Sequence, residues 1–195
     1  MKHIPRREFL NKAGLVALGA SLFPARGFSE SGQDVLAEPA SIGLQLYTVR
    51  NEIKDNIAKT LSRVAAIGFE AVETAFWPEN ISVQDAAKYL KDAGLPVSSA
   101  HVELPRGDKK ASMLETAEAF GCKKMIWHGW PEDKRYSTLD GTKELVEIYN
   151  EANHFAKLNG LQFGLHNHWW EYRNKVEGRY VYQVLLDSVE PDIFF

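Results

Sequence analysis

The chain has 195 residues, of which 45% are hydrophobic and 25% are charged, and its formal net charge at pH 7 is −3. This composition is typical of a globular protein and excludes a disordered tail and a collagen-like chain. A disulfide-stapled miniprotein is also excluded, because Cys122 is the single cysteine. The acidic balance argues against a protein that binds nucleic acid through bulk positive charge.

The first residues have the features of an export signal. Lys2 and the pair Arg6-Arg7 precede an apolar run over residues 13–23. That run is shorter than the roughly 20 apolar residues that a helix needs to span a bilayer. The paired arginines, followed after one residue by Phe9-Leu10, resemble a twin-arginine signal. We therefore expect an exported, periplasmic protein that is not an integral membrane protein.

The expected signal peptide covers residues 1–29, a polar linker covers 30–41 and the folded domain covers 42–195. The signal carries five basic side chains and one acidic side chain, so its removal would change the net charge from −3 to about −7. This change further disfavours nucleic acid as a partner.

Strand and helix patterns alternate through the expected domain. Short runs rich in apolar and β-branched residues predict strands over 42–49, 69–73, 97–102, 124–128 and 161–166, and the start of a sixth at 193–195. Apolar residues at helical spacing predict helices over 52–66, 82–93, 109–120, 139–158 and 178–189.

Glycine follows four of the predicted helices, at Gly68, Gly94, Gly121 and Gly160. Glycine adopts the left-handed conformation that turns a chain sharply out of a helix. Strands and helices alternating in this way predict an α/β protein with a parallel sheet and right-handed crossovers. Two architectures remain open, a (β/α)₈ barrel and an open doubly wound sheet. The first strand is followed by Arg50-Asn51-Glu52 and not by the glycine-rich phosphate loop of dinucleotide-binding sheets.

Polar side chains gather where the predicted strands end, which is where α/β proteins place their active sites. They are Gln45, Tyr47, Glu73, His101, Glu103, His128, His166, His168 and Glu171. Strand alternation predicts His166 and His168 on one side of the sheet and Asn167 on the other. Two histidines with a nearby carboxylate offer ligands for a divalent metal such as Mn²⁺, Mg²⁺ or Zn²⁺.

Five tryptophans also lie near the predicted strand ends: Trp77, Trp127, Trp130, Trp169 and Trp170. Aromatic faces suit the apolar faces of sugar rings, and each of these residues is equally compatible with core or lid packing. Their shared placement predicts a pocket of carbohydrate size.

Three segments together resemble the sugar phosphate isomerase/epimerase family, the xylose isomerase-like TIM barrels. They are residues 43–50 (GLQLYTVR), 68–73 (GFEAVE) and 166–172 (HNHWWEY). The resemblance implies a (β/α) barrel and one divalent metal (Mn, Mg, Zn or Co) held by two Glu, one Asp and one His. It also implies a sugar substrate, between whose adjacent carbons a proton is moved.

The same resemblance assigns roles to individual residues. Glu171 is implied as a metal ligand and catalytic carboxylate, and His101 as a second catalytic residue. The residues implied as substrate contacts are Gln45, Tyr47, Glu73, His128, His166, His168 and Trp169.

The resemblance covers about six of the eight barrel units, so we expect a truncated barrel that holds one of four metal ligands and is inactive alone. Asp192 is expected at the entrance of the sixth strand and not at the metal. The alternative hypothesis is a non-catalytic carbohydrate-binding module. A base-excision nuclease of the same fold is disfavoured by the acidic charge. The small-molecule partner is a sugar, and an oligomer is compatible with the sequence.

Overall fold

The computed structural model describes residues 41–129 and 132–195, so the expected signal peptide, nearly all of the linker and Trp130 lie outside the described residues. The strands are β1 (Gly43–Gln45), β2 (Ala71–Thr74), β3 (Val97–Val102), β4 (Lys124–Trp127), β5 (Gln162–Leu165), β6 (Lys175–Val176) and β7 (Arg179–Tyr180). The α-helices are α2 (Arg50–Asp55), α3 (Ile57–Ile67), α4 (Val83–Asp92), α5 (Lys109–Phe120), α6 (Leu139–Leu158), α7 (Trp169–Arg173) and α8 (Val181–Ser188). Within the described ranges, no helix is both long and apolar enough to cross a membrane.

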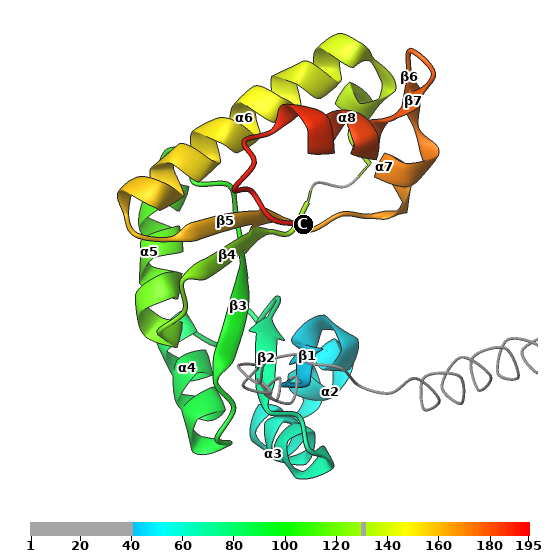
Figure 1. Cartoon of the computed structure of the whole chain (residues 1–195). Helices are drawn as coiled ribbons and strands as arrows, with labels where there is room; N and C mark the ends of the chain where they lie inside the picture. Colours follow the sequence, from blue (N-terminus) through cyan, green and yellow to red (C-terminus); the bar gives the residue numbers. More distant parts are fainter. Residues whose placement is uncertain (1–40, 130–131) are drawn as a thin grey trace, which may run out of the picture. The chain divides into compact units, whose positions relative to one another are not determined.

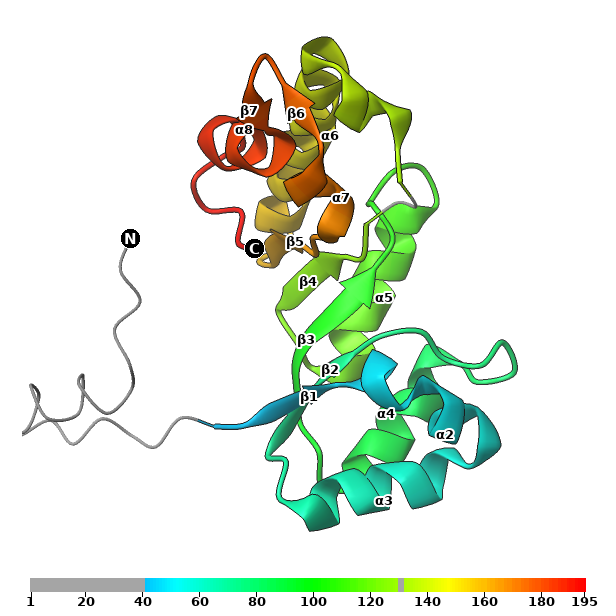
Figure 2. The same ribbon diagram turned by 90° about the vertical axis from the view of Figure 1, so that its right-hand side faces the viewer.

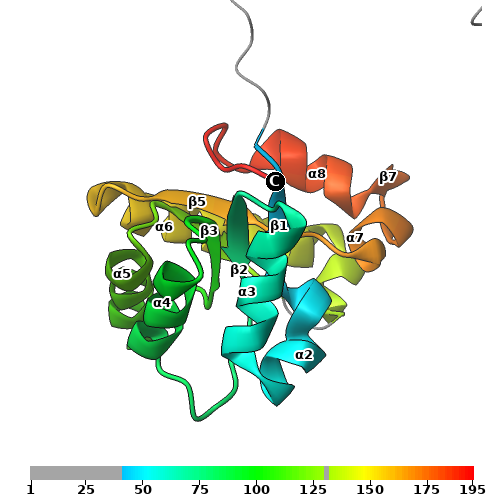
Figure 3. The same cartoon turned by 90° about the horizontal axis from the view of Figure 1, so that it is seen from below.

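The five main strands form one parallel sheet in the order β1-β2-β3-β4-β5 (Figure 1). A doubly wound sheet reverses its strand order near the middle, whereas consecutive strands with right-handed crossovers keep all their helices on one face. Figure 3 shows α3, α4 and α5 along one face of the sheet. The order therefore selects the barrel type of α/β fold over the doubly wound type.

The sheet's helix-covered face is apolar. Alternate side chains of β3, β4 and β5 are buried there, and they include Ala100, Met125, Trp127 and Phe163. The opposite face carries the intervening side chains, many of which are polar. This division explains why the strands alternate between buried core residues and candidate site residues.

The sixth parallel strand predicted at residues 193–195, which is distinct from the hairpin strand β6, meets β5 in a single bridge. Gly164 and Phe194 form a single parallel bridge, in which the Leu165 N–H donates to the Phe194 carbonyl at 2.9 Å. A Cβ on Gly164 would lie 2.4 Å from the Phe194 ring, so glycine is required for this close approach. Before this bridge, Asp192 pairs with Lys157 at 2.7 Å, at the entrance that the sequence predicts for it.

Three predicted elements are wrong in part. The first strand ends at Gln45 and continues as a 3₁₀ helix, η2 (Leu46–Val49), so Tyr47 does not lie on a strand. The predicted helix 52–66 is two helices, because Asn56 is extended and its side chain caps α3 by accepting from the Lys59 N–H at 3.0 Å. Residues 178–180, the start of the predicted helix 178–189, instead form the end of the turn and the strand β7 of the β6–β7 hairpin, which Figure 2 shows beside α8.

Candidate functional site

Strand register builds a polar network on the uncovered face of the sheet. Gln45, Glu73 and Ser99 are paired in register across β1, β2 and β3. The Glu73 carboxylate accepts from Gln45 Nε2 at 2.7 Å and from Ser99 Oγ at 2.6 Å, and it lies 3.0 Å from His101 Nε2. His101 follows Ser99 by two residues, so it lies one layer closer to the carboxyl ends of the strands.

Hydrogen bonding keeps the Glu73 carboxylate negatively charged. Burial raises the pKa of Glu73, but hydrogen bonds from His101, Ser99 and Gln45 outweigh burial and lower the pKa to about 2. Glu73 is therefore ionised at neutral pH and is a weak base. It can orient Gln45 and His101 better than it can accept a proton.

Four histidines surround one pocket at the carboxyl ends of the strands. His101 pairs in register with Ile126, and His128 and His166 follow β4 and β5 directly. The His166 ring centroid is 5.0 Å from that of His101 and 4.9 Å from that of His168. The cavity volume is about 370 Å³, and the remaining lining residues are Gln45, Tyr47, Phe76, Gly129 and Trp170.

Two of these histidines are neutral at pH 7. Burial and the neighbouring His101 lower the pKa of His166, and burial with His166, His128 and His101 lowers the pKa of His168 to about 4. Neutral imidazoles can accept protons or hydrogen bonds from a ligand. These two histidines thus offer hydrogen-bond acceptors without adding positive charge to the pocket.

Gly129 allows His168 to approach the pocket wall. Gly129 has φ +84°, and a Cβ there would lie 2.5 Å from Cε1 of His168. The His168 ring also stacks on Trp170, with centroids 4.1 Å apart and an interplanar angle of 12°. The ring is therefore fixed between backbone and aromatic packing.

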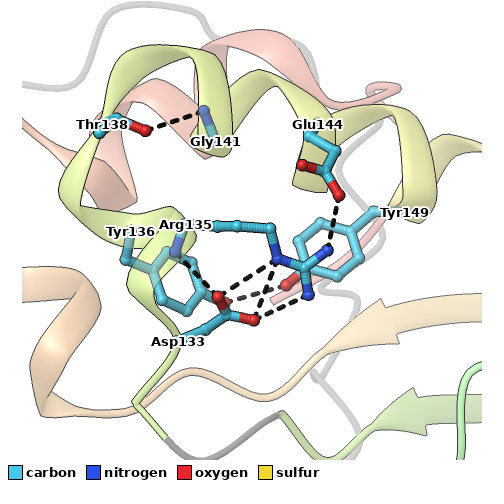
Figure 4. A network of polar contacts seen from close by, with 7 residues as sticks. All are labelled: Asp133, Arg135, Tyr136, Thr138, Gly141, Glu144 and Tyr149. Atoms are coloured by element: carbon cyan, nitrogen blue, oxygen red, sulfur yellow. Dashed lines mark hydrogen bonds and ion pairs between the residues drawn. The ribbon is translucent and has the colours of Figure 1, made fainter.

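A polar network anchors residues 133–138, just before α6 (Figure 4). Asp133 accepts from the backbone N–H of Arg135 at 2.8 Å and from its guanidinium at 2.7 Å, and Arg135 Nη1 donates to Glu144 at 3.0 Å. The hydrogen bonds from Arg135 lower the pKa of Asp133. Next to them, the hydroxyls of Tyr136 and Tyr149 lie 2.9 Å apart, and burial raises the pKa of Tyr149 to about 12. These contacts hold Arg135 and Tyr136 against α6.

The structure brings most of the sequence-predicted site residues together. Gln45, Tyr47, His101, His128, His166 and His168 line the same pocket. Glu73 lies behind Gln45 and His101 and is bonded to both. Asn167, predicted on the other side from His166 and His168, donates to the Tyr172 hydroxyl at 3.0 Å and does not line the pocket.

Glu171 and Trp169 lie outside this pocket. The Glu171 side chain is buried, and its carboxylate accepts from the His168 backbone N–H at 2.8 Å, which caps the short helix α7. Burial raises the pKa of Glu171. Trp169 is 57% exposed, and the Arg173 guanidinium lies 4.3 Å from its ring centroid. Their predicted roles in metal and substrate binding stay predictions.

One pocket aromatic, Phe76, was missed from the sequence, which pointed to its neighbour Trp77 instead. Phe76 lines the pocket, 55% exposed, and contacts Tyr47 and His128 edge-on. Its neighbour Trp77 packs against Phe120 in the core instead. Trp170 is the one described tryptophan that lines the cavity. The signal available for Phe76 was its position two residues after the end of β2.

The described residues do not fit a protein-bound divalent metal. Across residues 41–129 and 132–195, no group of three or more His, Cys, Asp or Glu side chains is placed to hold one. The two carboxylates nearest the histidines are engaged, since Glu73 holds His101, and Glu103 lies 3.0 Å from His128 Nε2.

Comparison with known proteins identifies the fold. Neither protein-family models nor curated proteins give a match. Among solved structures, a sugar phosphate isomerase/epimerase from Parabacteroides distasonis superposes with a TM-score of 0.65 at 25% identity, covering 79% of this chain and 67% of that chain. A second Parabacteroides distasonis protein of the same description gives a TM-score of 0.63 at 23% identity, covering 87% and 68%.

An AP endonuclease, family 2, from Brucella melitensis shares the fold with a TM-score of 0.55 at 16% identity, covering 79% of this chain and 67% of that chain. The chain thus has the α/β fold of the xylose isomerase-like TIM barrels, and its structural neighbours include sugar isomerases/epimerases. This fold also occurs in the nuclease, so the fold does not by itself define the reaction.

Proposed function

We propose that the protein is a sugar isomerase/epimerase-like protein whose pocket binds a sugar or sugar derivative. The observation that carries the proposal is the position of the histidine-lined cavity, at the carboxyl ends of parallel strands. The likeness to the two Parabacteroides distasonis structures supports it. In this class of reaction a proton moves from one sugar carbon to the adjacent one.

His101 is the best candidate for the proton acceptor. Its side chain is 5% exposed, and the ionised Glu73 beside Nε2 orients the ring. A carboxylate in this position also stabilises the imidazolium that forms when the ring takes a proton. His101 could return the same proton to the neighbouring carbon, while the neutral His166, with its ring 5.0 Å away, accepts a hydrogen bond from a sugar hydroxyl.

The predicted divalent metal would be needed for catalytic turnover of the sugar. When bound, such a metal would polarise the carbonyl and hydroxyl of the sugar. Because the described residues provide no set of three ligands, we expect this chain to bind sugar and to show no turnover alone.

Proton exchange in D₂O tests the reaction separately from binding. NMR would follow loss of the C–H signal next to the carbonyl of ketoses and aldoses, with and without Mn²⁺, Mg²⁺ or Zn²⁺. We expect binding without exchange above the buffer rate. Turnover comparable to that of a full-length homologue would contradict inactivity but support the isomerase assignment, whereas absence of binding to any sugar would refute the proposed function.

The second candidate function is a non-catalytic carbohydrate-binding module. The exposed aromatic side chains beside the pocket favour it, because they offer surface for a sugar ring. His101→Asn distinguishes the two functions, since it removes the proton acceptor and keeps a polar side chain of similar size. If the wild-type chain does show exchange, loss of that exchange in His101→Asn with unchanged sugar affinity would favour the enzyme over the module. The module would be favoured if Trp169→Ala weakened sugar binding and if binding needed no metal.

We also propose that residues 1–29 direct export to the periplasm by the twin-arginine route. The Arg6-Arg7 pair followed by Phe9-Leu10 supports this proposal. The double substitution Arg6→Lys and Arg7→Lys keeps the charge and should hold the protein in the cytoplasm. Cell fractionation measures the outcome, and periplasmic recovery of this variant at the wild-type level would contradict the proposal.

A further inference from the structure

We propose that the pocket is specific for a sugar without a phosphate group, held with one ring face against the aromatic wall formed by Tyr47 and Phe76. This inference rests on the proposed function and names the substrate class for the same site. It follows from the charges around the pocket and from the exposed rings at its rim.

Among the described residues, none that lines the pocket is a Lys or Arg that could receive a phosphate. Three carboxylates are bonded to the lining: Glu73 to Gln45 and His101, Glu103 to His128, and Glu171 to the backbone N–H of His168. A phosphate monoester carries between one and two negative charges at pH 7 and is bound by Arg, Lys or clustered N–H donors. Here it would meet anionic groups instead.

The histidines do not replace the missing cations. His166 and His168 are neutral at pH 7, because burial and neighbouring imidazoles lower the pKa of each. Any positive charge on His101 or His128 faces a carboxylate 3.0 Å away. Each of these two pairs is therefore close to neutral when its histidine is protonated and negative when it is not.

Arg50 is a cation near the rim, but its contacts are already with Tyr47. Its guanidinium carbon lies 4.2 Å from the Tyr47 ring centroid, and Nη1 donates to the Tyr47 carbonyl at 2.8 Å. Arg50 does not line the cavity. Its role in this arrangement is to hold the Tyr47 ring in place.

The aromatic wall presents apolar surface to the cavity. Tyr47 is 45% exposed and Phe76 is 55% exposed, and their ring centroids are 6.2 Å apart in an edge-to-face arrangement. Exposed aromatic faces are suited to the C–H face of a sugar ring. The cavity of about 370 Å³ is in the range of small-molecule pockets, which is roughly 300–1,000 Å³. Neutral hydroxyl groups would then face Gln45 and the imidazoles.

Matched sugar pairs test the proposal on the full chain. Glucose, fructose and ribulose would each be compared with the corresponding phosphate ester by calorimetry and ligand-observed NMR at pH 7. For each sugar that binds, we expect the neutral member to bind at least about tenfold more tightly. The weak binding of the ester should improve with added salt, because salt screens repulsion between like charges.

Phe76→Ala tests the aromatic wall, with Tyr180→Ala as the matched control. Tyr180 is 40% exposed on β7 and does not line the pocket. We expect Phe76→Ala to weaken the neutral sugar at least about fivefold and Tyr180→Ala to leave its affinity unchanged. Circular dichroism would confirm that both variants are folded.

The remaining outcomes are distinguishable. Tighter binding of the phosphate esters, weakened by salt and by Arg50→Gln, would overturn the inference and leave the proposed function standing. Unchanged affinity of the neutral sugar in Phe76→Ala would overturn the aromatic wall. Absence of binding by every sugar and ester would overturn the proposed function and the inference together.

Discussion

Glu73 is surrounded by three hydrogen-bonding side chains that come from the two strands beside it, β1 and β3. Gln45, Ser99 and His101 lie within 3.0 Å of its carboxylate. These bonds favour the ionised form, so the pKa falls from 4.5 to about 2. A fall of this size corresponds to folding stability on the order of 3 kcal/mol. Because the folded-state pKa is the lower one, this stability is present above pH 4.5 and is lost as the pH falls towards 2.

We therefore expect Glu73→Gln to remove a pH-dependent part of the free energy of unfolding. The difference between the wild type and Glu73→Gln should be on the order of 3 kcal/mol larger at pH 7 than near pH 2. Urea unfolding at a series of pH values measures this difference. Glu103→Gln is the control, since Glu103 also pairs with a histidine but its side chain is 51% exposed. A difference for Glu73→Gln that does not change with pH would contradict the assigned cause.

At the scale of helices and strands, the order of elements could be predicted from the sequence and their breaks could not. Gly68, Gly94, Gly121 and Gly160 all have positive φ, as the glycine junctions predict. The apolar spacing from Ile53 to Val64 passes through Asn56 without interruption, because periodicity records which face is buried and not whether the backbone continues.

The same limit applies to the candidate site. Strand-end positions identified the histidines, because parallel strands bring their carboxyl ends to one edge. The sequence could not show that Glu171 turns back to cap α7, since that depends on the backbone hydrogen bond from His168. The sequence also could not show that Phe76, and not Trp77, lines the pocket. The direction of each side chain after β2 is set by the loop and not by strand alternation.

The beginning of the sixth strand provides a prediction about an element. Gly164→Ala would place a Cβ 2.4 Å from the Phe194 ring, so Phe194 must move and the bridge to β5 should weaken. Overpacking of this kind costs about 1–3 kcal/mol. We expect hydrogen exchange of the Leu165 amide, which donates to Phe194, to accelerate at least about fivefold. Gly43→Ala is the control, because its Cβ would make an ordinary contact with the Ala71 carbonyl at 3.5 Å. Equal exchange in both variants would argue against the bridge.

Across the described molecule, apolar burial is divided unequally between two clusters. The smaller cluster has seven buried side chains from η2, the helices α2 to α4 and β2, with the adjoining Leu95. The larger has 23 and extends from β3 to the end of α8 and Ile193. Val97 and Phe120 pack against both clusters, and they provide the apolar link between them. Regions with less apolar burial open locally at lower free energy, so we expect β1 and β2 to be the less stable part of the sheet.

Paired cavity variants test this division of stability. Leu61 in the smaller cluster and Leu145 in the larger are both 0% exposed, and Leu→Ala at such positions costs about 2–5 kcal/mol. We expect Leu61→Ala to accelerate amide exchange in β1 and β2 while β4 and β5 keep their protection. Leu145→Ala should accelerate exchange in all five strands, because the smaller cluster depends on the larger one for its packing at Val97 and Phe120. Hydrogen exchange with mass spectrometry measures both patterns. A uniform loss of protection in Leu61→Ala would contradict this division and would mean that the sheet opens as one cooperative unit. The histidine pocket takes residues from both β1 and the end of β5, so it would then lose its shape in a single step.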